Sequence, residues 1–134
     1  MLKYIFISWL NGYKNIFNYQ GRERRSAFGW FLLTNLLIFI LLIKVYIDQD
    51  AEQYTTIKLC LLISYLFITF FAMIAYNVRR FHDANQSGLC CLFYLLSVPI
   101  TVIVSVFLSP HYGDNIYGPD PKKPIIVNKQ LIIN

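Results

Sequence analysis

Three long apolar stretches constrain this chain more than any other feature of its sequence. Residues 27–43 carry no charge and extend to 47 past Lys44, residues 57–78 carry only Lys58 at one edge, and residues 89–109 carry none. A helix rises about 1.5 Å per residue, so about 20 residues cross the apolar core of a bilayer. Three such stretches in 134 residues leave little polar sequence to cover them in water. We therefore predict an all-α integral membrane protein with transmembrane helices at about 27–47, 57–78 and 89–109.

The composition agrees with a membrane protein. Hydrophobic residues make up 57% of the chain and charged residues 14%, and the mean hydropathy is +0.49. A soluble domain of this length would need more polar surface. We expect one membrane domain over residues 1–121, which ends in a polar cap at 110–121, and a peripheral tail at 122–134.

Residues 2–18 have the pattern of an amphipathic helix that lies in the membrane interface. Apolar side chains recur at helical spacing, at Leu2, Ile5, Phe6, Trp9, Leu10, Tyr13, Ile16 and Phe17. Lysines and asparagines occupy other positions of the same segment, at Lys3, Asn11, Lys14 and Asn18. The segment lacks the cleavage site of a signal peptide, so we expect the mature protein to retain it.

The basic residues predict the orientation. Five precede the first span, whereas the loop at 48–56 contains acids and no lysine or arginine. By the positive-inside rule, the N-terminus is cytoplasmic, that loop faces outward, and the connection after residue 78 returns to the cytoplasm. These features predict a multi-pass membrane protein with a cytoplasmic N-terminus.

The third stretch allows two topologies. Three spans would place residues 110–134 outside, although this segment carries Lys122, Lys123 and Lys129. Alternatively, Pro99 could break the stretch into a re-entrant hairpin. We favour a true span.

Three polar motifs flank these stretches: FNYQGRERRSAFGWF at 17–31, VRRFHDANQSG at 78–88 and GDNIYGPDP at 113–121. In this order and spacing, the chain resembles, over roughly residues 10–121, the small bacterial inner-membrane proteins grouped as domain of unknown function 805. The resemblance implies a multi-span membrane protein whose biochemical activity is not established. The chain departs from the family at Ala27, where an acidic residue is usual, and at Leu89 and Cys90, where a tryptophan pair is usual.

The motifs supply candidate contacts for a lipid head group or a small ligand, because arginine binds phosphate through two parallel hydrogen bonds. The candidates are Gly21, Arg22, Arg25, Arg79, Arg80, His82, Asp83, Ser87, Gly88, Asn115, Tyr117 and Gly118. The third motif can pair with the arginines only if both lie on the same side of the membrane.

Local structural roles compete with these functional ones. Gly21 would permit a turn, and Ser26 is placed to cap the first span. Arg79 and Asp83 stand four residues apart and can pair on one helix face. Ser97, Thr101 and Ser105 form a small polar stripe, which we assign to helix packing within the chain or between copies.

Catalysis, metals and cofactors are not indicated. His82 and Asp83 have no nucleophile placed beside them by sequence, and His111 stands alone in the tail. We expect no enzyme activity, no metal, no cofactor and no nucleic-acid partner. The expected role is that of a structural or accessory membrane protein whose basic motifs contact anionic lipids. The alternative is a small subunit of a transporter or other membrane complex, or a homo-oligomer.

Overall fold

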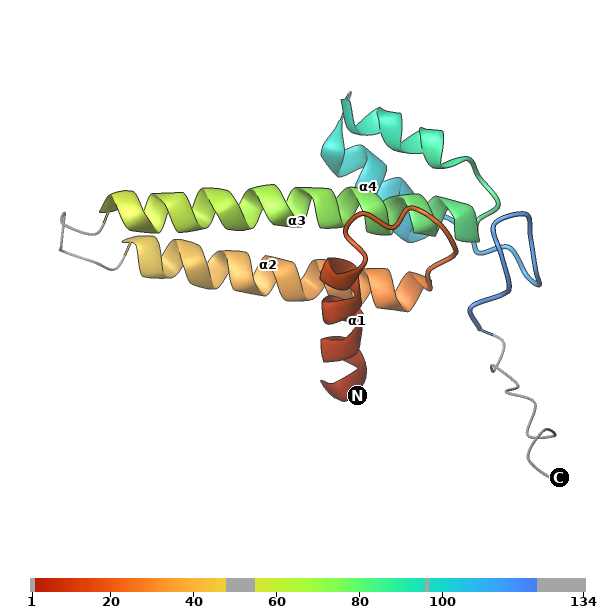
Figure 1. Cartoon of the computed structure of the whole chain (residues 1–134), viewed down its shortest axis with the longest axis horizontal. Coiled ribbons are helices and arrows are strands. Elements are labelled where there is room, and N and C mark those ends of the chain that lie inside the picture. The colour runs from red at the N-terminus through yellow and green to blue at the C-terminus, as the bar shows by residue number, and fades with distance from the viewer. Residues whose placement is uncertain (1, 48–54, 96, 123–134) are drawn as a thin grey trace, which may run out of the picture.

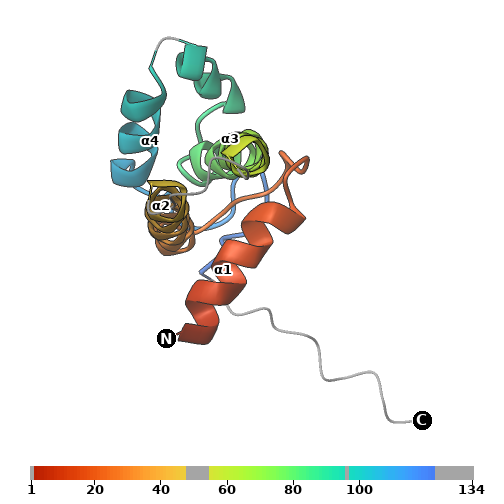
Figure 2. The same cartoon turned by 90° about the vertical axis from the view of Figure 1, so that its left-hand side faces the viewer.

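The computed structural model describes residues 2–47, 55–95 and 97–122. Its elements, in chain order, are α1 (Leu2–Lys14), α2 (Arg25–Ile47), α3 (Thr55–Asp83), the 3-10 helix η2 (Gly88–Leu95) and α4 (Val98–Phe107). Helices α2 and α3 lie side by side, and α1 crosses them (Figures 1 and 2). Within the described ranges the chain forms helices and no strand, apart from one isolated bridge. The predicted all-helical class is therefore confirmed.

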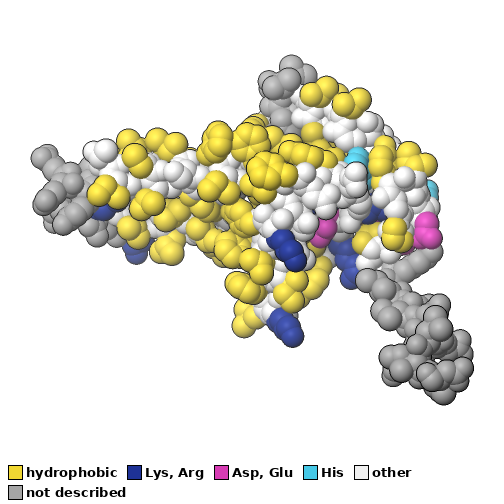
Figure 3. Space-filling view, in the orientation of Figure 1, with side chains coloured by type: hydrophobic (Ala, Val, Ile, Leu, Met, Phe, Trp, Pro, Cys, Tyr) yellow, Lys and Arg dark blue, Asp and Glu magenta, His cyan; other side chains and the backbone are white. Residues whose placement is uncertain are grey.

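Two of the helices are long and apolar enough to cross a membrane, Arg25–Ile47 and Thr56–Asp83. Few of their side chains are buried inside the protein, so most of their apolar surface is exposed (Figure 3). This pattern fits a protein whose solvent is lipid. Helix α3 continues five residues beyond the predicted end at Val78, and Arg79 and Arg80 lie in its last turns.

The core forms where α1 meets α2 and α3. The rings of Phe31 and Tyr76 lie 4.9 Å apart between centroids, and Phe28 packs on the same tyrosine at 5.5 Å. Gly12 permits this packing, because a Cβ atom there would lie 2.4 Å from the ring of Phe31. A larger residue at position 12 would push α1 away from the other two helices.

The stretch predicted as a third transmembrane helix is not one helix. It forms η2 and α4, and the ten residues of α4 span only about 15 Å at 1.5 Å per residue. The amide of His111 donates to the carbonyl of Asp83 at 2.8 Å, so the chain returns to the end of α3 from which it departed. The prediction of one continuous helix over 89–109 is therefore wrong, and the segment forms a hairpin of two short helices (Figure 1).

Pro99 explains where the second helix of the hairpin begins. It stands in the first turn of α4, where its missing N–H costs no helical hydrogen bond. The polar stripe then faces the rest of the chain: Thr101 is 2% exposed and Ser105 is fully buried. Their hydroxyl groups donate to the carbonyls of Ser97 and Val102 in the same helix region. Thr101 and Ser105 thus pack within the chain, whereas Ser97 is half-buried.

The remaining expectations differ in detail or lie outside the described part. Helix α1 ends at Lys14, four residues before the predicted end of the interfacial helix. Most of the loop predicted to face outward, and the tail beyond residue 122, lie outside the described residues.

Candidate functional site

The three polar motifs meet at one end of the molecule. We call residues 18–25, 76–88 and 108–121 the polar end. It joins the loop before α2, the last turns of α3 and the segment after α4, which lie together at the same end of α3 (Figure 1). The third motif therefore lies beside the arginines of the first two motifs.

Asp83 lies at the centre of the polar end. Its Oδ1 accepts from Nη2 and Nε of Arg22 at 3.0 and 3.2 Å, and its Oδ2 accepts from Nη1 of Arg80 at 2.8 Å. All three side chains are buried, with exposed fractions of 3%, 1% and 0%. The predicted pair between Arg79 and Asp83 is wrong, because Asp83 pairs with Arg80 in the same helix and with Arg22 of the first motif.

Arg22 also holds the third motif through its backbone. Its Nη1 donates to the carbonyl of Gly113 at 2.6 Å and that of Gly118 at 3.4 Å, and its Nη2 donates to the carbonyl of His111 at 2.7 Å. Guanidinium groups suit this position, because they present five donors and remain charged. One side chain thus connects all three motifs.

Arg79 faces the loop before α2 instead. It donates to the carbonyls of Asn15 and Asn18 at 3.0 and 2.5 Å, and it lies 3.8 Å from Oε2 of Glu23. The Tyr76 hydroxyl donates to the other oxygen of that carboxylate at 3.1 Å. Burial raises the pKa of Glu23, and the nearby Arg79 opposes this shift.

The other arginines differ in exposure. Arg80 is fully buried and also donates to the carbonyl of Leu108, while Arg24 donates to that of Pro121 at 2.5 Å. Arg25 is exposed, and its guanidinium lies 5.9 Å from the ring centroid of Phe107. Of the four arginines predicted to contact lipid, three bind protein groups in the interior and Arg25 lies at the surface.

His82 links the same three motifs. Its Nδ1 lies 3.2 Å from the carbonyl of Gly21, and its ring stacks on Tyr117 with centroids 3.9 Å apart and planes 3° apart. Asn115 donates to the His82 carbonyl at 2.9 Å. A Cβ atom at Gly88 would lie 3.0 Å from Nε2 of the histidine. His82 therefore contacts residues from all three motifs, which gives the histidine a structural role.

The third motif folds as a tight loop. Asn115 and Gly118 exchange backbone hydrogen bonds at 3.1 and 3.0 Å, and Gly118 has φ +133°, which favours glycine. The carboxylate of Asp120 accepts from the backbone amides of Lys122 and Gly113, and these two bonds lower its pKa. The turn formers of the motif thus shape the loop that Arg22 binds.

Three further local expectations can be compared with the structure. Gly21 has φ +83°, as a turn there requires. Ser87 accepts from the amide of Leu89 at 3.2 Å at the start of η2. Ser26 is not the N-cap of the first span, because α2 already begins at Arg25; its hydroxyl instead lies 3.0 Å from that of Tyr4 in α1.

A polar network deeper in the helices was not predicted. The hydroxyl of Tyr13 lies 2.5 Å from Oδ1 of Asn35 and 2.8 Å from Oγ1 of Thr69, and Tyr65 donates to the same amide oxygen at 3.0 Å. This network joins α1 to both long helices. Asn35 in the middle of an apolar stretch was the available signal, since such a group needs a partner in lipid.

Comparisons with known proteins identify the family. The family described as protein of unknown function, DUF805, matches residues 16–119. The chain is 28% identical over 118 residues to the inner membrane protein YhaI of Escherichia coli K12, which covers 85% of this chain and 94% of YhaI. It is 29% identical over 116 residues to the inner membrane protein YhaH of the same strain, with 85% and 95% coverage. No solved structure matches the chain. The resemblance seen in the three motifs is thereby confirmed: the chain belongs to the DUF805 family, whose members in Escherichia coli include proteins named inner membrane proteins.

Proposed function

We propose that this protein is a structural or accessory protein of the bacterial inner membrane whose polar end lies at the cytoplasmic surface and contacts anionic lipid head groups. The observation that carries this proposal is the position of α1. This helix crosses the long apolar helices next to the polar end, as an interfacial helix would (Figure 1).

The three faces of α1 support an interfacial position. One face, with Ser8 and Gly12, packs on the protein, and an adjacent face exposes the apolar residues Leu2, Phe6 and Leu10. Tyr4 and Asn11 lie on the side opposite the exposed apolar face, and they line a cavity together with residues of the polar end. The exposed apolar face therefore looks away from the polar end.

The hairpin supports a topology with two spans. With α2 and α3 as the spans, both ends of the described chain lie on one side. The N-terminal segment and the segment after α4 then lie on the same side, and the sequence of each contains more basic than acidic residues. The positive-inside rule favours a cytoplasmic position for both, which removes the conflict that a third span creates.

A topology measurement tests this arrangement. A reporter that is active only in the cytoplasm, fused after Asn134, is expected to give a signal, and a reporter that is active only outside is expected to be silent. The matched control places both reporters in the loop between α2 and α3, where the pattern should reverse. An outside signal from the C-terminal fusion would contradict the two-span topology.

Lys3 and Lys14 of α1 and Arg25 at the start of α2 are exposed cations that can reach lipid phosphates at this surface. Their exposure leaves the guanidinium and ammonium groups free to approach lipid, whereas Arg22, Arg79 and Arg80 bind protein acceptors. An ammonium or guanidinium near an acidic leaflet contributes about 1 kcal/mol of attraction. Burial of Thr101 and Ser105 supports this role over that of a transporter subunit, because these two residues of the polar stripe pack within the chain and offer a partner no exposed contact.

The lipid contact is tested with a triple variant, Lys3→Gln, Lys14→Gln and Arg25→Gln. The full chain is given equal amounts of phosphatidylglycerol and phosphatidylcholine and studied by native mass spectrometry. The preference for the acidic lipid should fall about a hundredfold, as about 3 kcal/mol of lost attraction predicts. The control, Lys44→Gln with Lys58→Gln, removes two lysines from the opposite end and should change the preference less. Equal preferences in the two variants would refute the assignment to this surface.

A further inference from the structure

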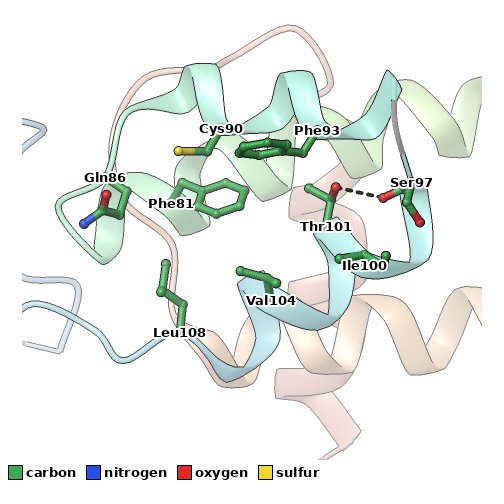
Figure 4. A pocket seen from close by; sticks show the side chains of 9 residues that line it. All are labelled: Phe81, Gln86, Cys90, Phe93, Ser97, Ile100, Thr101, Val104 and Leu108. Carbon is green, nitrogen blue, oxygen red and sulfur yellow. Dashed lines mark hydrogen bonds between the residues drawn. The ribbon is translucent and has the colours of Figure 1, made fainter.

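The hairpin encloses an apolar cavity of about 480 Å³. Phe81 of α3 forms one wall, Cys90 and Phe93 of η2 form a second, and Ile100 and Val104 of α4 form a third. Figure 4 shows these side chains around a common space, with Gln86 at one end and Ser97 at the other. The volume lies within the range of pockets that bind small molecules.

The walls of this cavity continue onto the outer surface of the protein. Phe93, Ile100 and Val104 line the cavity, yet they are 58%, 62% and 45% exposed. In a membrane these side chains contact lipid, so the medium next to the cavity is made of acyl chains. Water in this cavity would find few hydrogen-bond partners, because the walls are apolar. An empty cavity would lose the dispersion contacts of its walls. An acyl chain is therefore a better occupant than water or empty space.

A cation marks where the head group of such a lipid would lie. Leu108 lines the cavity on the same side as Gln86 (Figure 4), and it directly follows Phe107, over whose ring the exposed Arg25 lies. The carbonyl of Leu108 binds Arg80, so this end of the cavity adjoins the polar end. An acyl chain that enters beside Leu108 and extends toward Ser97 therefore places its phosphate within reach of a guanidinium group, which binds phosphate well.

We propose that this cavity holds one acyl chain of an anionic phospholipid, with its phosphate at Arg25. The inference rests on the proposed function, since it uses the same head-group contact, and it adds a defined site for the lipid tail. The site differs from the general lipid surface, because a chain inside the hairpin is surrounded by three elements of the protein.

Filling the cavity tests the tail site. Val104→Trp and Ile100→Trp each place an indole at the cavity wall, and Ile103→Trp adds the same group to α4 at a residue that is 56% exposed and does not line the cavity. The full chain is incubated with equal amounts of phosphatidylglycerol and phosphatidylcholine of identical chains. Native mass spectrometry then counts the lipid that remains after loosely bound lipid is removed. We expect about tenfold less retained lipid in both filled variants and a change within about twofold in the control.

A second measurement leaves the cavity unfilled. With Cys60→Ser and Cys91→Ser, the Cys90 thiol in the wall is the remaining target for an apolar maleimide. Its modification should slow when phosphatidylglycerol is added to the detergent-purified protein, and should slow less after Arg25→Gln. An unchanged rate would overturn the cavity site even if a tryptophan variant failed to fold.

The outcomes separate this inference from the proposed function. Equal lipid retention in the filled and control variants, with the preference for phosphatidylglycerol intact, would overturn the cavity site and leave the head-group surface standing. Loss of lipid in the filled variants without any lipid preference would retain the tail site and overturn the phosphate assignment together with the proposed function.

Discussion

The substitution Asp83→Asn is the most direct test of the polar end. It keeps the shape of the side chain and removes the negative charge that lies between Arg22 and Arg80. Both arginines approach the carboxylate within 3.0 Å, and none of the three side chains is more than 3% exposed. The variant therefore leaves two guanidinium groups buried next to each other without a counter-ion.

The expected cost follows from that burial. Removing one partner of a buried ion pair typically costs about 3–5 kcal/mol, because the remaining charge is neither solvated nor paired. Two cations share this carboxylate, so we expect the loss to fall in that range although asparagine retains one acceptor oxygen. The control Asp114→Asn makes the same chemical change at an exposed carboxylate, whose Oδ1 accepts a hydrogen bond from the amide of Asp120 at 3.0 Å. Asparagine retains an acceptor oxygen for this bond, so we expect a change of at most about 1 kcal/mol.

The assay is denaturant unfolding of the full chain in mixed micelles, followed by helical circular dichroism. A double-mutant cycle with Arg22→Met separates the pair from its surroundings, and the two changes together should cost less than their sum by at least about 1 kcal/mol. The reasoning is refuted if Asp83→Asn costs no more than the control, or if the cycle is additive.

Two further changes test other parts of the fold. Gly12→Ala places a Cβ atom 2.4 Å from the ring of Phe31 and should destabilise the protein by about 1–3 kcal/mol in the same assay, whereas Gly29→Ala, with nothing within 4 Å, should be tolerated. Burial raises the pKa of Glu23 above 4.5, despite Arg79, so the folded chain binds this proton at a higher pH than the unfolded chain. The wild type should then gain stability relative to Glu23→Gln as the pH falls from neutral toward about 4.5, and a pH-independent difference would contradict that assignment.

Hydropathy predicts the two long helices well and the hairpin poorly. Residues 27–47 and 57–78 carry one lysine each, Lys44 and Lys58, both near an end of the stretch, and α2 and α3 cover the two stretches. Residues 89–109 pass the same test of length and composition, although they form two short helices. Only the position of Pro99, at the start of α4, distinguished this stretch, and proline also occurs inside spanning helices.

The partners of the arginines could not be predicted from residue types. Arg22, Arg79 and Arg80 bind backbone carbonyls, and any residue carries such a group. These acceptors belong to His111, Gly113, Gly118, Asn15, Asn18 and Leu108. Spacing within one helix suggested a pair between Arg79 and Asp83, but tertiary contacts to the first motif replaced it. The third motif lies beside these arginines because the hairpin returns the chain to the end of α3, and the hairpin itself was not predicted.

Burial also decides which substitutions can report lipid contact. The side chains of Arg22, Arg79 and Arg80 are 1%, 4% and 0% exposed, so replacing any of them disrupts the polar end before it changes the surface charge. Lipid lost from such a variant would follow from a damaged fold and would not demonstrate a direct contact. Arg25 is exposed, and its replacement by glutamine leaves the buried pairs with Asp83 in place. A fall in anionic lipid binding in Arg25→Gln, at unchanged stability, is therefore the result that would assign the phosphate to a single side chain.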